Sequence, residues 1–110
     1  MLSIVLLGTG NIAQHLFENL QNLPTVKLTQ VYGRTAEGLS YFQQKCDTTS
    51  KADAIKDADL YILAVSDRAI PTVAHLLELK KGLVVHTSGT VPMDTIPMER
   101  RGVFYPLQTF

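Results

Sequence analysis

The feature that most constrains this chain is a glycine-containing hexapeptide between an apolar run and an amphipathic segment. Leu2–Leu7 carries no charge and has the length of a buried strand. It leads directly into Gly8-Thr9-Gly10-Asn11-Ile12-Ala13, which has the form G-x-G-x-x-A. Asn11–Leu23 then has apolar residues at helical spacing, and Pro24 helps to end the helix. The expected apolar residues of this helix are Ile12, Ala13, Leu16, Phe17, Leu20 and Leu23.

Each small residue of the hexapeptide suits a nucleotide-binding turn. Gly8 permits a tight turn off the strand, Gly10 leaves room for a pyrophosphate at the backbone, and Ala13 lets the helix pack close to the sheet. Backbone N–H groups at Asn11–Ala13, together with the helix dipole, favour phosphate oxygens. The pattern therefore predicts a dinucleotide site. A tight strand-to-helix turn that binds nothing is the alternative interpretation.

The rest of the chain alternates between short apolar runs and amphipathic segments. Further strands are expected at Lys27–Tyr32, near Thr48-Thr49, at Leu60–Val65, at Leu83–His86 and at Gly102–Tyr105. Helices are expected at Thr35–Lys45 with an interruption at Gly38, after Ser50 as a short cap-led turn, and from Ser66 or Asp67 to about Leu79. Val91–Met98 is expected to be a loop or a single turn. Buried strands joined by helices require parallel pairing with right-handed crossovers. The predicted fold class is α/β: a doubly wound, mainly parallel sheet of about six strands with helices on both faces.

The end of the second strand favours one nicotinamide cofactor over the other. An NAD site usually places Asp or Glu there to accept from the ribose 2′-hydroxyl, but no acid occurs from Val26 to Ala36. Arg34 and Thr35 follow the strand instead, and a guanidinium makes charge-assisted bonds to a 2′-phosphate. NADP(H) is therefore favoured over NAD(H). The alternatives are a solvated Arg34 and a Thr35 that only caps the next helix.

Two later strand ends supply the remaining candidates. Ala64 and Val65 are small enough to flank the nicotinamide ribose, while Ser66, with the adjacent Asp67, either contacts the ribose or caps the following helix. After the fifth strand, His86-Thr87-Ser88-Gly89-Thr90 groups a histidine with three hydroxyls. His86 is either a general acid or a residue that only orients the loop, and Ser88 and Gly89 offer a hydroxyl and a backbone N–H to a substrate carboxylate. His86 and Ser88 are therefore the candidates for catalysis. The alternative is a locally bonded turn with His86 half-buried at the strand end.

Composition excludes several functions. The chain has 110 residues with 10 Lys+Arg and 10 Asp+Glu, so its formal charge is zero, and the cations are scattered. A nucleic-acid surface is therefore not expected. Cys46 is the one cysteine and the three histidines are separated, so no metal site is expected. The Leu2–Leu7 run is far shorter than a membrane span, and the single cysteine suits a reducing cytoplasm.

Five segments in this order resemble one family. They are Gly8–Ala13, Tyr32–Thr35, Ala58–Asp67, His86–Thr90 and Val103–Phe110. The chain resembles Rossmann-type, NADP-binding oxidoreductase-like proteins of unassigned substrate. That family is related to pyrroline-5-carboxylate reductase and to the clan of 6-phosphogluconate, 3-hydroxyisobutyrate and prephenate dehydrogenases.

The resemblance implies roles for particular residues. Gly8, Gly10, Asn11 and Ile12, with Thr9 between them, would contact the pyrophosphate. Arg34 and Thr35 would contact the 2′-phosphate, and Ala64, Val65 and Ser66 would contact the ribose and nicotinamide. His86–Gly89 and Pro106–Gln108 would border the substrate pocket. Tyr105 stands where many relatives carry histidine, so the resemblance does not carry an acid-base role over to that position.

The resemblance also implies an incomplete enzyme. Residues 1–110 correspond to the NAD(P)-binding domain, and the α-helical domain that follows in relatives is absent, so a fragment that is inactive alone and a homodimer are both expected. The expected function is the NADP(H)-binding domain of an oxidoreductase that transfers hydride to or from a small keto, imino or hydroxy acid. A nucleotide-sensing module without turnover is the alternative, and a flavin or methyl-donor site is a third.

Overall fold

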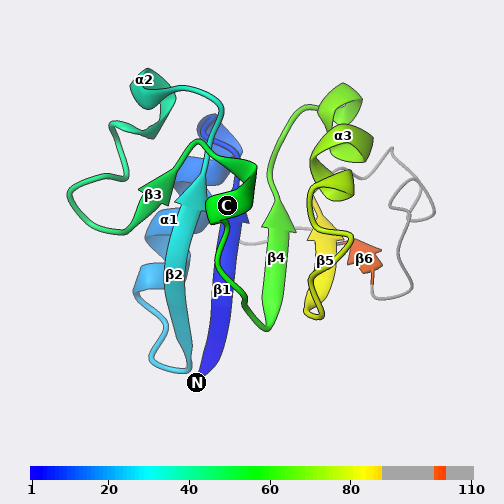
Figure 1. Cartoon of the computed structure of the whole chain (residues 1–110). Helices are drawn as coiled ribbons and strands as arrows, with labels where there is room; N and C mark the ends of the chain where they lie inside the picture. The colour runs from blue at the N-terminus through cyan, green and yellow to red at the C-terminus, as the bar shows by residue number, and fades with distance from the viewer. Residues whose placement is uncertain (88–100, 104–110) are drawn as a thin grey trace.

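The fold is a single parallel sheet covered by helices on both faces (Figure 1). The computed structural model describes residues 1–87 and 101–103. Its six strands lie in the order β3-β2-β1-β4-β5-β6, and every neighbouring pair is parallel. The strands are β1 (Leu2–Leu7), β2 (Val26–Tyr32), β3 (Thr48–Thr49), β4 (Leu60–Leu63), β5 (Leu83–His86) and β6 (Arg101–Val103). The predicted fold class is therefore confirmed.

The helical elements are shorter than the sequence pattern suggests. They are α1 (Asn11–Gln21), α2 (Ala36–Leu39), α3 (Ile70–His75) and the 3₁₀ turns η1 (Ala52–Ala54) and η2 (Asp67–Ala69). Several residues for which the sequence predicts a role or a conformation lie outside the described residues. They are Ser88, Gly89, Thr90, Val91–Met98, Tyr105 and Pro106–Gln108. Within the part of the chain that is described, no helix has both the length and the hydrophobicity needed to cross a membrane.

Two hydrophobic cores form because successive side chains of a strand point to opposite faces of the sheet. In β1, Ile4 and Leu6 join one core, and Val5 and Leu7 join the other. The first core includes the buried face of α1, and the second includes α3. Figure 1 shows α1 behind the sheet and α3 in front of it.

The predicted face of α1 was wrong at both ends. The buried residues are Ala13, Leu16, Phe17 and Leu20, which follow helical spacing. Ile12 is 39% exposed, because it precedes this stripe at the open end of the helix, and Leu23 is 47% exposed, because it lies beyond the last helical residue.

The helix after β2 ends early. Thr35 caps α2: its side-chain oxygen accepts a hydrogen bond from the Gly38 N–H at 3.0 Å. The regular helix stops at Leu39 instead of Lys45, which fits the poor helix propensity of the glycine inside it. The capping alternative for Thr35 is therefore realised. The cap expected at Ser50 was wrong, because Lys51 occupies the N-cap of η1 and makes no side-chain cap bond.

The helix after β4 begins as a 3₁₀ turn. Ser66 is the N-cap of η2 but its side chain makes no cap bond, so that alternative for Ser66 is not realised. Pro71 lies in the first turn of α3, where its missing N–H costs no helical bond. The helix ends at His75, before the predicted Leu79, although the predicted buried face of Ile70, Val73, Ala74 and Leu77 is confirmed.

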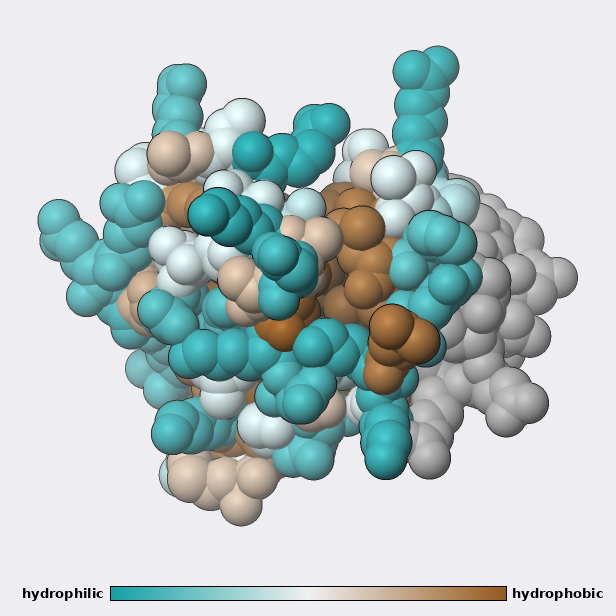
Figure 2. All heavy atoms as spheres, viewed as in Figure 1, coloured by the Kyte–Doolittle hydropathy of each residue, from teal (hydrophilic) through white to brown (hydrophobic). Residues whose placement is uncertain are grey.

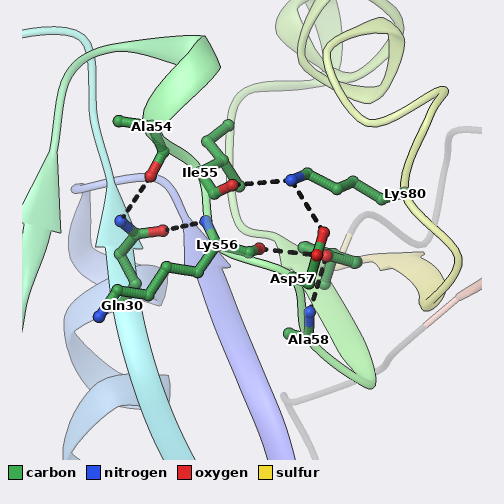
Figure 3. Close-up of polar contacts among 8 residues, drawn as sticks. Gln30, Ala54, Ile55, Lys56, Asp57, Ala58 and Lys80 are labelled. Atoms are coloured by element: carbon green, nitrogen blue, oxygen red, sulfur yellow. Dashed lines mark hydrogen bonds and ion pairs between the residues drawn. The ribbon is translucent and has the colours of Figure 1, made fainter.

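A buried glutamine fastens the connection from β3 to β4 (Figure 3). Gln30 is 2% exposed; its Nε2 donates to the Ala54 carbonyl at 3.0 Å, and its Oε1 accepts from the Lys56 N–H at 2.9 Å. From the other side, Lys80 Nζ donates to the Ile55 carbonyl at 2.8 Å. These bonds attach the segment from the end of η1 to Lys56 both to β2 and to the α3–β5 connection, so it is held in place from two sides.

Candidate functional site

The carboxyl ends of the central strands meet at one edge of the sheet and open into a cleft of about 640 Å³. The strand ends are tied by backbone bonds: Gly8 N–H donates to the Tyr32 carbonyl at 2.9 Å, and Ala64 N–H donates to the Leu7 carbonyl at 2.8 Å. In an open parallel sheet, this edge at the reversal of strand order is where ligands bind. The lining residues are Gly8, Thr9, Gly10, Tyr32, Gly33, Arg34, Ala64, Val65, Ser66, Arg68, Ala69, Thr72 and Val73.

The cleft has two walls of different chemistry. The first wall is formed by the turn Gly8-Thr9-Gly10, called the glycine turn below, and by the end of β2. The second wall is formed by the end of β4 with η2 and α3. Four lining residues of the second wall are small or aliphatic: Ala64, Val65, Ala69 and Val73. Figure 2 shows hydrophobic surface (brown) in a hollow between the two sides of this face of the molecule. The second wall therefore offers apolar surface to a flat ligand group.

The fold requires glycine at position 8. Gly8 has a φ of +133°, and a Cβ there would lie 2.1 Å from the carbonyl oxygen of Ala64. No other residue fits both the backbone angle and the contact with β4. The tight turn predicted for Gly8 is confirmed.

The fold does not require glycine at position 10. Gly10 has a φ of −79°, and a Cβ there would meet nothing within 4 Å. Gly10 is also the N-cap of α1 and has no side chain that could cap the helix. Its carbonyl accepts a hydrogen bond from the Gln14 N–H at 3.0 Å. Gln14 is thus the first residue whose N–H has an acceptor within the helix, and the N–H groups of Asn11–Ala13 have none there. Open space and backbone donors therefore meet at the start of α1.

Thr9 packs the glycine turn against the loop that carries Arg34. A Cβ added to Gly33 would lie 2.5 Å from Cγ2 of Thr9, and one added to Gly38 would lie 2.9 Å from its Oγ1. The Thr9 side chain thus fills the space that two glycines leave free. This packing fixes the β2–α2 loop, and Arg34 with it, beside the glycine turn.

Seven of the ten predicted binding residues line the cleft: Gly8, Thr9, Gly10, Arg34, Ala64, Val65 and Ser66. Asn11 and Ile12 stand at the exposed start of α1, and Thr35 caps α2; none of the three is among the lining residues. The structure therefore brings the glycine turn, the end of β2 and the end of β4 into one site.

Sequence reasoning missed Arg68. This exposed residue lies in η2 and lines the second wall, as do Ala69, Thr72 and Val73 further along. The sequence shows a cation shortly after the β4 strand, but its place in the wall of the cleft is set by the fold. Tyr32, the last residue of β2, is a further lining residue to which no role was given.

The histidines do not gather at the cleft. His86 is the last residue of β5, is fully buried rather than half-buried, and is not a lining residue. Its register partners are Leu63 of β4 and Val103 of β6. His15 and His75 are exposed, and His75 Nδ1 lies 2.7 Å from Glu78 Oε1. In the described part of the chain, no group of three His, Cys, Asp or Glu side chains could hold a metal ion.

Comparisons with known proteins agree with this geometry. The model of a family described as NADP oxidoreductase, coenzyme F420-dependent, matches residues 3–89. A solved protein described as an NADP oxidoreductase, from Bacteroides fragilis, is 35% identical, with a TM-score of 0.85 over 99% of this chain and 45% of its own. The comparison with curated proteins yields no match.

Two more distant structures share the fold alone. Prephenate dehydrogenase from A. aeolicus, solved with hydroxyphenyl propionate and NAD+, is 15% identical with a TM-score of 0.82, over 100% of this chain and 43% of that one. Biliverdin reductase from Synechocystis, solved with biliverdin and NADP+, is 15% identical with a TM-score of 0.74, over 93% of this chain and 37% of that one. The present chain thus spans less than half the length of each of these solved structures.

Proposed function

Because the chain belongs to the family described as NADP oxidoreductase, coenzyme F420-dependent, we propose that its cleft binds NADP(H). We further propose that it is the cofactor-binding part of an oxidoreductase that transfers hydride to or from a small keto, imino or hydroxy acid. When bound, NADPH supplies the hydride, and the protein supplies binding, orientation and electrostatics.

The proposal rests mainly on which residues line the cleft and on their charges. Among the described residues, its lining contains the guanidiniums of Arg34 and Arg68 and no carboxylate. The space in front of Gly10 is open, although the fold itself does not need a glycine there. Backbone donors, cations and unfilled space at one site suit a phosphorylated ligand.

The roles of the chain's own residues follow from their places. Gly8, Thr9 and Gly10, with the first N–H groups of α1 at Asn11 and Ile12, would hold the pyrophosphate. Arg34, fixed beside the turn through Thr9, would bind the 2′-phosphate, and Thr35 would support it by capping α2. Ala64, Val65 and Ser66 would flank a ribose along the second wall.

The end of β2 supports NADP(H) over NAD(H). The related fold binds NAD+ in one solved protein and NADP+ in another, so the fold alone does not select between them. Selection depends on the residues that meet the adenosine ribose. Here those would be Gly33 and Arg34, which line the cleft, and no acid occurs between Val26 and Ala36 to accept from a free 2′-hydroxyl.

The proposal also covers the substrate class and the residues that would act on the substrate. His86 and Ser88 remain the candidates for catalysis, with His86 buried at the end of β5 and Ser88 outside the described residues. A screen of NADPH oxidation with small keto, imino and hydroxy acids tests the substrate class. It includes coenzyme F420, which the family description names.

The cofactor assignment is tested by calorimetric titration of the wild-type chain and of Arg34→Ala with NADPH and NADH. We expect wild type to bind NADPH more tightly and the variant to lose roughly tenfold for NADPH only, in line with about 1.4 kcal/mol for bonds to a charged group. Lys27→Ala is the matched control, because Lys27 is an exposed cation near the start of β2, away from the cleft. Equal affinities for the two nucleotides in wild type would exclude a 2′-phosphate at Arg34.

A further inference from the structure

Arg68 is the charged residue of the second wall, and the proposed function counts its charge among the features that suit a phosphorylated ligand without assigning it a particular phosphate. It lies in η2, the turn that follows β4 after residues 64–66, and its side chain is exposed and lines the cleft. Arg34 belongs to the opposite wall, beside the glycine turn. The two arginines therefore reach one cleft from segments that are 34 positions apart in sequence (68 − 34).

The charges of the cleft are unbalanced. Among residues 1–87, neither Arg34 nor Arg68 takes part in an ion pair, and no Asp or Glu lines the cleft. Two like charges that face one cleft repel each other, and the repulsion is strongest where water is excluded. An anion placed between them would remove this repulsion and gain bonds from both.

The rest of the second wall fits the group that adjoins such an anion in a nucleotide. Ala69 and Val73 supply apolar surface of the kind that packs on a purine ring. Arg68 and Thr72 are the polar residues of η2 and α3 in this wall, and they are one helical turn apart. An adenosine on the apolar surface would thus have a cation and a hydroxyl close to its ribose.

We propose that Arg68 is a second specificity-determining residue, whose guanidinium binds the 2′-phosphate of NADP(H) from the wall opposite Arg34. This inference rests on the proposed function, since it assumes that the cleft holds NADP(H). A phosphate monoester carries up to two negative charges and has three acceptor oxygens, so it accepts from two guanidinium forks at once. The pyrophosphate, in contrast, belongs to the glycine turn and the start of α1.

The test compares nucleotides that differ in the 2′-phosphate. Calorimetric titrations of wild type, Arg68→Ala and Arg68→Lys use NADPH against NADH, and 2′,5′-ADP against 5′-AMP. We expect Arg68→Ala to weaken NADPH and 2′,5′-ADP roughly tenfold, which corresponds to about 1.4 kcal/mol. NADH and 5′-AMP should change by less than about twofold. Arg68→Lys should lie between the two, because it keeps the charge and loses the fork.

Two controls isolate the effect. Lys27→Ala removes one exposed positive charge away from the cleft, so it reports any loss caused by the general field alone. The melting temperature of each variant shows that it is folded, and little change is expected because Arg68 is exposed.

The outcomes separate this inference from the function on which it rests. If Arg68→Ala weakens phosphorylated and unphosphorylated nucleotides equally, Arg68 contacts a shared part such as adenine, and the inference is overturned. If Arg34→Ala loses NADPH affinity while Arg68→Ala does not, the inference fails and the proposed function stands. If wild type binds neither NADPH nor 2′,5′-ADP, the proposed function itself fails.

Discussion

Replacing each of the two glycines of the turn by alanine should separate folding from binding. Gly8→Ala forces an L residue into a φ of +133° and places a Cβ 2.1 Å from the Ala64 carbonyl oxygen. Backbone strain of this kind costs about 1–3 kcal/mol, and overpacking costs about 1–3 kcal/mol more. Gly8→Ala should therefore lose about 2–6 kcal/mol of the roughly 5–15 kcal/mol that stabilises a domain.

Gly10→Ala should be close to neutral for folding. The φ of −79° is open to alanine, and the added Cβ meets nothing within 4 Å. Alanine makes the unfolded chain less flexible, which stabilises the folded protein by about 0.4–1 kcal/mol. Alanine is also a poorer N-cap than glycine, and this offsets part of that stabilisation. The same methyl group would stand where a pyrophosphate approaches the backbone, so NADPH affinity should fall at least roughly tenfold.

Thermal denaturation and NADPH titration of the two variants make the comparison. At roughly 4 °C per kcal/mol, Gly8→Ala should melt roughly 8–24 °C lower than wild type, and Gly10→Ala should melt within about 4 °C of it. A Gly10→Ala protein that binds NADPH like wild type would refute the claim that Gly10 is kept open for a phosphate. A Gly8→Ala protein as stable as wild type would refute the argument from the turn geometry.

Two further predictions concern stability. Gln30→Leu removes both bonds that fasten the β3–β4 connection, at Ala54 and Lys56, and should cost about 1–3 kcal/mol in urea denaturation. The exposed control Gln43→Leu should stay within about 0.5 kcal/mol, and equal losses would contradict a specific role for Gln30. The Ser3 N–H and hydroxyl donate to Asp59 Oδ2 at 2.9 and 3.0 Å and lower the pKa of that carboxyl. Since the folded pKa is depressed, this stabilisation is present above the usual pKa of the carboxyl and is lost as pH falls through the folded value. Ser3→Ala should raise the Asp59 pKa toward its ordinary value in a carboxyl NMR titration, and an unchanged pKa would contradict the assignment.

The sheet could be predicted from sequence because its strands are short apolar runs between clear breaks. Leu2–Leu7 and Leu83–His86 match the observed strands at both ends. The role of Gly8 also followed from the pattern, since a strand that turns at once into a helix needs an unusual backbone angle. These features depend on local sequence, so no knowledge of the packing was needed.

Other features depend on which elements lie side by side in space. Ile12 fits a helical period but lies at the open end of α1, where it is left exposed. The packing of the Thr9 side chain against Gly33 and Gly38 joins three separate segments. Residue spacing along the chain does not predict this contact. Arg68 was missed for the same reason, because only the folded cleft places it in the wall opposite Arg34.

The central claim is that the cleft at the ends of β1, β2 and β4 binds NADP(H). Backbone amide NMR shifts of the isotopically labelled chain, recorded during titration with NADP+, test it most directly. We expect the largest shifts at the glycine turn, at Gly33-Arg34 and at the β4 end through Ala69. Saturable shifts that cluster elsewhere, or no shifts at millimolar NADP+, would contradict it.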